Sequence, residues 1–380
     1  MAGMVSALVD DAAPARTGRV SREVEPKRAK APFSIPSLDG LRAASFLMVF
    51  LSHAGAPGMP GGFGVTVFFF LSGYLITTLM RLELEETGRV SLRHFYLRRV
   101  LRILPPFYIL LGTATALAAA GFLGGQLYAP AVRAQALHYS NIYIALHGWD
   151  GIAAGTGVLW SLAVEEHFYL GFPALFIALE RLGIRGKRMA IAFWILCAAV
   201  LAWRCVLVFS FHAPLDRTFI ATDARFDSML FGCALAVFRN PALDGADRPL
   251  SPVWTRVLLP LGVLLLLVTF VVRSDTFRES VRYSLQGVGL YPLFVTAIRR
   301  PDWGVYRILN LPVVRHLGVL SYSLYLGHHV ILDGVEERLG SSGLVRGALA
   351  LALSLAFAEG MFRFVEKPCA RLRRRFSKVT

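Results

Sequence analysis

Long apolar runs are the feature that most constrains the fold of this chain. The stretch from 253 to 272 holds a single charged residue, Arg256, and is long enough to span a bilayer as a helix. Several such runs follow one another, and the mean hydropathy of +0.55 is higher than soluble domains usually reach. Only helices and closed barrels satisfy their backbone hydrogen bonds in lipid. The sequence therefore predicts an all-α, polytopic membrane protein.

The distribution of basic residues predicts how the helices are oriented. With the N-terminus inside, 30 of the 40 Lys and Arg residues fall on the inner side and eight on the outer side. By the positive-inside rule both termini are then cytoplasmic, in a multi-pass protein of the cell membrane. The net charge of +15 reflects this topology and attraction to membrane lipid, so no nucleic-acid partner is expected. We expect about ten transmembrane helices, at 38–54, 63–81, 102–122, 160–180, 189–210, 224–238, 253–272, 280–298, 316–332 and 344–363.

Composition divides the chain into three parts. Residues 1–33 are polar and lack an apolar core, so we expect a disordered cytoplasmic tail that is not a signal peptide. Residues 34–366 form the membrane domain, and residues 367–380 a basic cytoplasmic tail. The segment 132–146 favours a short helix in the membrane interface, and a spanning helix there is the alternative. The four cysteines show no paired spacing and are interpreted as free thiols.

The first predicted helix carries Arg42 and His53, eleven residues apart. That is almost three turns, so both side chains lie on nearly one face, about 16 Å apart along the axis. A charge inside a membrane span is costly and is by default interpreted as functional. The alternative is that Arg42 extends toward the interface and His53 marks the end of the span.

Two further arginines stand at the predicted cytoplasmic start of the third helix. Arg99 and Arg102 are i, i+3 neighbours, and Arg98 precedes them. Two guanidinium groups on one face suit a phosphorylated ligand. An ordinary positive-inside anchor is an equally good interpretation from charge alone.

The segment from Trp160 to Leu170 places Glu165, Glu166 and an imidazole in an otherwise apolar stretch. If this helix enters from outside, the two carboxylates lie at the depth of His53. A carboxylate that bonds an imidazole fixes its tautomer and raises its basicity, which suits a general base for a hydroxyl. A polar clamp between helices is the alternative.

Other polar residues are expected near the same outer face. Arg225 and Asp227 are interpreted first as a structural ion pair and second as substrate contacts. His328 and His329 end the ninth predicted helix. With His167 and the glutamates they raise the question of a metal site, but no ligand spacing such as HExxH is present, so none is expected.

Seven motifs occur in an order that resembles the membrane acyltransferase-3 family, which includes O-antigen, Nod-factor and macrolide O-acyltransferases. They cover about residues 36–370. They are Leu38-Asp39-Gly40-Leu41-Arg42 with His53, Phe68–Ile76, Arg98-Arg99-x-x-Arg102-Ile103-x-Pro105, Trp160–Tyr169, Arg225-Phe226-Asp227, Ser321–Leu326 and Glu366-Lys367-Pro368. The chain departs from the family pattern at Gly327-His328-His329 and at His167, where relatives often carry Trp-His and Gln.

The resemblance implies transfer of an acyl group, often acetyl, from cytoplasmic acyl-CoA to a hydroxyl of a sugar-containing acceptor. It implies that Arg42 and His53 are essential, and it carries the family's Arg-x-x-Arg pair onto Arg99 and Arg102 and its Ser-x-x-x-Glu element onto Ser161 and Glu165. On this basis we expect Arg99 and Arg102, with Arg98, to bind the CoA phosphates. We expect His53, oriented by Glu165 or Glu166, to be the catalytic base, and covalent transfer through His53 is the alternative. Ser161, Arg225, Asp227 and His328 are candidate acceptor contacts. A polysaccharide, a lipid-linked glycan and a macrolide all remain possible acceptors. A glycolipid flippase, or a scaffold whose charges only clamp helices, is the rival function.

Overall fold

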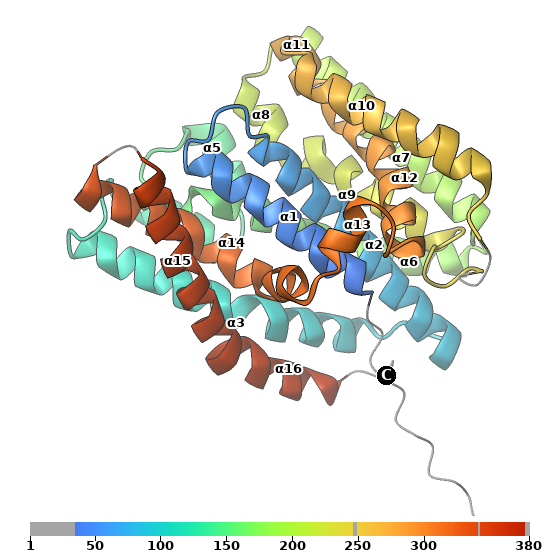
Figure 1. Ribbon diagram of the computed structural model, residues 1–380, viewed down its shortest axis with the longest axis horizontal. Coiled ribbons are helices and arrows are strands. Elements are labelled where there is room, and N and C mark those ends of the chain that lie inside the picture. The colour runs from blue at the N-terminus through green and yellow to red at the C-terminus, as the bar shows by residue number, and fades with distance from the viewer. Residues whose placement is uncertain (1–34, 246–248, 341–342, 377–380) are drawn as a thin grey trace, which may run out of the picture.

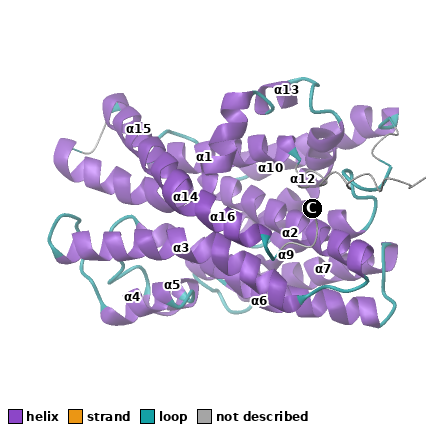
Figure 2. Ribbon diagram, turned by 90° about the horizontal axis from the view of Figure 1, so that it is seen from below, coloured by secondary structure: helices purple, strands orange, loops and turns teal. Residues whose placement is uncertain are grey.

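The computed structural model describes residues 35–245, 249–340 and 343–376, so the tail predicted for 1–33 lies outside the described residues. Every regular element within these ranges is a helix, which confirms the all-α class (Figure 2). In chain order the elements are α1 (Pro36–His53), α2 (Gly61–Thr87), α3 (Leu92–Ala119), α4 (Ala129–Ala136), α5 (Ser140–His147), η1 (Thr156–Leu159), α6 (Trp160–Arg181), α7 (Lys187–Phe209), α8 (Leu215–Ile220), α9 (Thr222–Val237), η2 (Trp254–Leu258), α10 (Leu259–Val271), α11 (Asp275–Glu279), α12 (Arg282–Arg299), α13 (Val305–Leu309), α14 (Pro312–Leu339), α15 (Leu344–Met361), η3 (Phe362–Glu366) and α16 (Lys367–Arg374).

The ten predicted helices all have counterparts, and six segments of the described chain are long and apolar enough to cross a membrane. A multi-pass membrane protein fits these segments. The other four counterparts are α1, α9, α12 and α14, and their crossing of the bilayer stays a prediction, as does the cytoplasmic position of both termini. The six segments are Gly61–Thr87, Leu92–Ala119, Thr156–Arg181, Lys187–Phe209, Trp254–Val271 and Leu344–Arg374.

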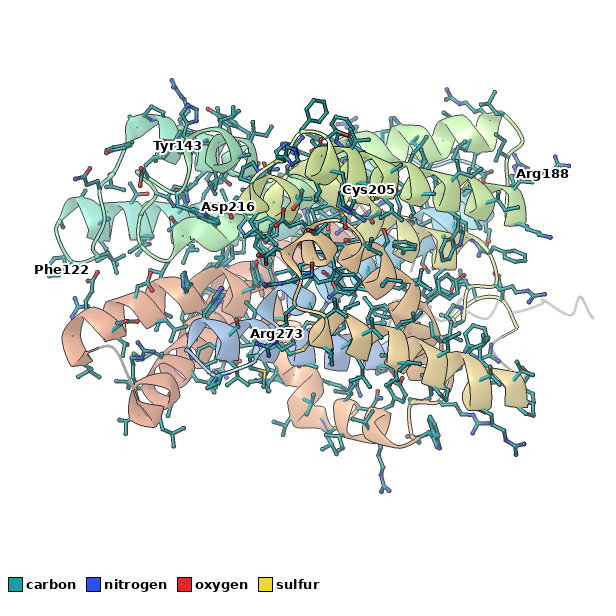
Figure 3. All side chains as sticks on the ribbon, turned by 90° about the horizontal axis from the view of Figure 1, so that it is seen from above. Phe122, Tyr143, Arg188, Cys205, Asp216 and Arg273 are labelled. Atoms are coloured by element: carbon teal, nitrogen blue, oxygen red, sulfur yellow. The ribbon has the colours of Figure 1, made fainter. Side chains whose placement is uncertain are left out.

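Helix α1 runs through the middle of the molecule between α2 and α14, while α3 and α16 lie side by side along one edge (Figure 1). The two ends of the bundle are marked by Phe122 and Arg188, which lie far apart (Figure 3). At the first end the Gly124 N–H donates to Glu337 near the end of α14, and His53 at the end of α1 contacts His328 of α14. We call this the His53 end. Arg42 and Arg102 lie toward the opposite, Arg102 end.

Small residues allow α2 and α9 to cross closely. A Cβ atom on Gly73 would collide with the carbonyl of Met229, and one on Gly232 would collide with that of Phe70. Gly73 and Gly232 therefore have a packing role, because only glycine lets these backbones touch. This contact holds α2, which carries part of the candidate site, against the centre of the bundle.

The segment predicted to lie in the interface or to span forms two short helices, α4 and α5, of eight residues each. Eight helical residues extend about 12 Å, so neither crosses a bilayer. His138 separates them and adopts a left-handed backbone conformation with φ of 57°. The spanning alternative for 132–146 is therefore wrong, and the interfacial one fits the lengths of these helices.

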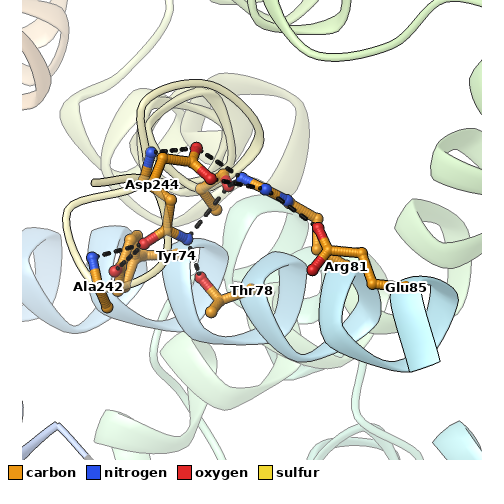
Figure 4. Close-up of polar contacts among 8 residues, drawn as sticks. Tyr74, Thr78, Arg81, Glu85, Ala242 and Asp244 are labelled. Atoms are coloured by element: carbon orange, nitrogen blue, oxygen red, sulfur yellow. Dashed lines mark hydrogen bonds and ion pairs between the residues drawn. The ribbon is translucent and has the colours of Figure 1, made fainter. Parts of the chain in front are cut away.

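The loop after α9 is fixed to α2 by a polar clamp (Figure 4). The Asn240 side chain accepts from Tyr74 Oη at 2.7 Å and donates to Thr78 Oγ1 at 2.9 Å. Arg81 donates to both carboxylate oxygens of Asp244, at 2.9 and 3.1 Å. No buried side-chain polar atom of Tyr74, Thr78, Arg81, Asn240 or Asp244 lacks a partner, so the clamp stabilises the loop without leaving a buried group free for a ligand.

The expected ion pair between Arg225 and Asp227 is wrong. Asp227 pairs with Arg204 of α7 at 2.6 Å and accepts from Ser284 at 2.9 Å, while Arg225 donates to Thr66 at 3.1 Å and to a backbone carbonyl. Residues two apart on a helix point away from each other, which is why they take different partners. Both are fully buried, so their packing favours the structural role over the substrate contacts expected as an alternative.

Candidate functional site

Three cavities toward the Arg102 end share two side chains, Arg42 from α1 and Arg102 from α3. The arginine cavity has a volume of about 420 Å³, and a side cavity of about 270 Å³ adjoins it. The neck, of about 90 Å³, extends from the same two arginines toward the middle of the bundle. The arginine cavity is lined by Arg42, Arg98, Arg99, Arg102, Arg373 and Arg374, together with Asp39 and Glu83.

Only part of this positive charge is neutralised within the protein. Arg42 pairs with Asp39 at 2.7 Å, and Arg98 pairs with the buried Glu83 at 2.7 Å. Among the described residues, Arg99, Arg102 and Arg373 form no ion pair with a carboxylate. Arg99 and Arg102 line the same cavity, as i, i+3 neighbours on one face of α3 can, and this cavity keeps positive charge that a polyanionic ligand would neutralise.

Aromatic and carboxylate groups hold the walls of the neck. The Arg99 guanidinium lies over the Tyr169 ring, 5.0 Å from its centroid. Glu165 accepts from Ser72 Oγ and from Tyr169 Oη, each at 3.0 Å. Of the two adjacent glutamates, Glu165 lines the neck, whereas Glu166 is not among its lining residues. The two carboxylates therefore point in different directions, as their adjacent positions on a helix require.

A fourth space, the histidine cavity, has a volume of about 430 Å³ and adjoins the neck. Both are lined by Val65 and Tyr325, so these side chains stand at the boundary between them. The Tyr325 hydroxyl lies 2.7 Å from Ser161 Oγ at this point. The histidine cavity is lined by His53, Trp149, Trp160, Phe219, Tyr325 and His329, and by the glycines Gly61, Gly62, Gly155 and Gly157.

The hydrogen bonds around His53 fix the position of its protons. His328 Nδ1 lies 2.8 Å from the backbone carbonyl oxygen of Tyr325, which can only accept. Neutral His328 must therefore carry its proton on Nδ1 and accept with Nε2. His53 Nδ1 lies 2.8 Å from that Nε2 and so donates to it. The Nε2 of exposed His53 is left with a free lone pair, which is the state that a general base needs.

The expectation that Glu165 or Glu166 orients His53 is wrong, because His328 of α14 takes that place. The reason lies in the length of α6. Trp160, at the start of α6, lines the histidine cavity, and Glu165 follows five residues later, about 7.5 Å farther along the axis. Glu165 thus lies in the neck with the arginines. His328 was expected to contact substrate, but it is fully buried behind His53.

Three side chains that the sequence did not single out line the same cavities. Tyr169 lies one helical turn after Glu165, and that spacing was visible in the motif. Tyr325 belongs to the Ser321–Leu326 motif, but its contact with Ser161 joins α14 to α6 and has no local signal. Arg373 of α16 was assigned to the basic tail, and its place in the arginine cavity depends on α16 packing against α3 (Figure 1).

The sequence predicts neither a disulfide nor a metal site. All four cysteines are unpaired, as expected, and two of them are buried. Within the described ranges, no three His, Cys, Asp or Glu side chains are grouped so that they could hold a metal ion.

The site combines an arginine-lined cavity, a narrow neck and a histidine with a free lone pair, all within a helical membrane protein. This combination is typical of a membrane enzyme with an anionic substrate. The sequence over residues 35–359 matches the family described as "Acyltransferase domain", and the chain belongs to this membrane acyltransferase-3 family. No solved structure matches the chain.

Several curated relatives are similar over most of this chain. A putative O-acetyltransferase of Staphylococcus aureus is 29% identical over 357 residues, which cover 88% of this chain and 57% of the relative. The peptidoglycan O-acetyltransferase OatA of Listeria monocytogenes is 28% identical, covering 88% and 55%. The putative peptidoglycan O-acetyltransferase YrhL of Bacillus subtilis is 28% identical, covering 88% and 54%. The chain thus spans little more than half the length of these relatives.

Proposed function

We propose that this protein is an integral membrane O-acyltransferase of the cell membrane. It moves an acyl group, acetyl foremost, from cytoplasmic acyl-CoA to a hydroxyl of a carbohydrate-containing acceptor. The observation that carries the proposal is the series of cavities from the free arginines through the neck to His53. Two relatives named as peptidoglycan O-acetyltransferases favour a sugar acceptor. Family membership does not favour the flippase alternative.

The donor is bound at the Arg102 end, which faces the cytoplasm in this proposal. Arg99 and Arg102 bind the CoA phosphates, and Arg98 and Arg42 border the same space. Arg42 also reaches the neck, so it lies beside the arm that carries the thioester. The arm is narrow and largely uncharged, which matches the small volume of the neck. The thioester carbonyl is then placed near Tyr325.

The acceptor enters the histidine cavity from the other side of the membrane. His53 Nε2 removes the hydroxyl proton, and the oxygen attacks the thioester carbonyl. A C–O bond forms, the C–S bond breaks, and the CoA sulfur leaves and takes up the proton that His53 removed from the hydroxyl. The Tyr325 hydroxyl lies at the boundary of neck and cavity, 2.7 Å from Ser161 Oγ. When Ser161 donates to Tyr325, the Tyr325 proton is free to be donated to the carbonyl oxygen as its charge develops. Glu165 positions Tyr169 and Ser72 in the wall of the neck.

The mechanism is tested by His53→Ala in purified protein in lipid nanodiscs, with CoA thiol release and acetylated glycan as readouts. General base catalysis contributes about 10²–10⁴-fold, so transfer should fall by that factor. His147→Ala is the matched control, because His147 is an exposed histidine of α5 at the same end of the bundle and lines none of the four cavities. Unchanged turnover in His53→Ala would remove the proposed base.

A further inference from the structure

A fifth cavity opens beside the histidine cavity and has no part in the mechanism above. This rim cavity has a volume of about 490 Å³. It shares Ser52, Gly61, Gly62 and Phe219 with the histidine cavity, so the two spaces adjoin at the end of α1. A molecule that reaches His53 therefore has a second compartment within its reach.

Arginine side chains dominate the charge of the rim cavity. Arg273, Arg278 and Arg282 line it, against a single carboxylate, Asp216, which accepts from Trp149 Nε1 at 2.9 Å. Asp216 and Arg273 come from separate segments and are both labelled in Figure 3. Arg278 pairs with Asp275 at 3.6 Å on the surface, and such an exposed ion pair contributes little to stability and neutralises the arginine only weakly. The rim cavity therefore carries a net positive charge.

Two polar atoms of its wall have no partner within the described protein. The buried Nε of Arg282 donates to nothing, although the same guanidinium donates to Tyr283 Oη at 2.9 Å. Gln286 is 3% exposed and donates to Thr269 at 3.3 Å, but its Oε1 accepts no hydrogen bond. Unpaired buried polar atoms are costly, so a free N–H and a free acceptor on residues that line one cavity point to a ligand with both an anionic oxygen and a hydroxyl.

We propose that the rim cavity binds a phosphate or carboxylate carried by the acceptor, while a hydroxyl of the same molecule reaches His53. The proposal rests on the proposed function and narrows the acceptor to an anionic, hydroxylated molecule. Arg273 and Arg282 bind the anion, and Gln286 Oε1 accepts from a hydroxyl of the sugar. The anionic group comes either from the glycan itself or from the phosphate of the lipid that carries it.

The test measures binding to the full-length protein in phosphatidylcholine nanodiscs, with a neutral hexosamine tetrasaccharide and a hexuronate tetrasaccharide as probes. We expect the hexuronate to bind about tenfold more tightly, with a preference that weakens at high salt. Arg273→Gln/Arg282→Gln should abolish the preference. Arg338→Gln should preserve it, because Arg338 is an exposed arginine at the same end of the bundle and does not line the rim cavity.

Further arms separate the sources of the anion and guard against misfolding. One further probe is a neutral sugar linked to polyprenyl phosphate. If it binds about tenfold more tightly than the free sugar, and only when Arg273 and Arg282 are both present, the site binds the lipid phosphate. Equal binding of all probes overturns the proposal. Arg273→Gln alone changes an exposed side chain, so it keeps the test valid if the double variant does not fold. Acetyl-CoA binding is measured in the same samples, and its absence would refute the proposed function without touching anion binding.

Discussion

The polar clamp around Asn240 and the arginine cavity use similar residues in opposite ways. In the clamp, Arg81 donates to Asp244, to Glu85 and to a backbone carbonyl, so its charge is fully met within the protein (Figure 4). In the cavity, Arg99 and Arg102 face open space without a carboxylate partner among the described residues. The two regions therefore differ in whether carboxylates within the protein neutralise the arginine side chains, and not in residue type.

A double substitution in the arginine cavity should change the KM for acetyl-CoA more than any substitution in the clamp. Arg99→Gln/Arg102→Gln should raise the KM for acetyl-CoA by about 100-fold or more, because each arginine contributes a charge-assisted hydrogen bond to phosphate. Removal of like charges that repel each other should leave the Tm of the detergent-solubilised protein unchanged or higher. Steady-state kinetics and scanning fluorimetry check both. A lowered Tm with an unchanged KM would show that the arginines are structural.

A substitution in the clamp should lower the Tm and leave the KM for acetyl-CoA unchanged. Asn240→Ala removes a fully buried amide and leaves Tyr74 and Thr78 without partners, at a cost of about 3 kcal/mol. We expect a clearly lower Tm but an unchanged KM for acetyl-CoA in the protein that remains folded. A raised KM at an unaltered Tm would contradict the division between the two regions.

Arg373 tests how far the cavity extends along the chain. Arg373→Gln should raise the KM for acetyl-CoA only about three- to tenfold, because this partly exposed cation is screened by solvent. The effect should shrink at high ionic strength. Arg371→Gln is the matched control on the same helix, since Arg371 is exposed and lies outside the arginine cavity. Equal effects of the two substitutions would remove α16 from the donor site.

The smallest effect is a pH dependence of the clamp. Burial opposes ionisation of Asp244, but hydrogen bonds from Arg81 and from the Asn240 backbone outweigh it, so the pKa of this carboxyl is lowered. The ionised form therefore stabilises the folded state above the ordinary pKa of aspartate, and that stabilisation is lost as the pH falls through the lowered value. Asp244→Asn should make the Tm less sensitive to pH below about 4. An identical acid response in both proteins would exclude Asp244 as a source.

The helices were predictable because their apolar length leaves little choice in lipid. Arg42, Arg99 and Arg102 were also identified, since charge within a membrane helix stands out in the sequence. The partner of His53 was not identified. Equal depth in the membrane suggested Glu165 or Glu166, whereas five residues of helix rise separate Glu165 in the neck from Trp160, which lines the histidine cavity. The ion pair of Asp227 with Arg204 was also not predicted, because it joins two helices that are separate in the sequence.

If the donor lies between Arg99, Arg102 and His53, as we claim, a structure with a non-hydrolysable acetyl-CoA analogue will show it there. The diphosphate should lie against Arg99 and Arg102, with the pantetheine arm in the neck and the acetyl carbonyl next to Tyr325, facing His53 Nε2. An analogue bound elsewhere, with an empty neck, would contradict the claim.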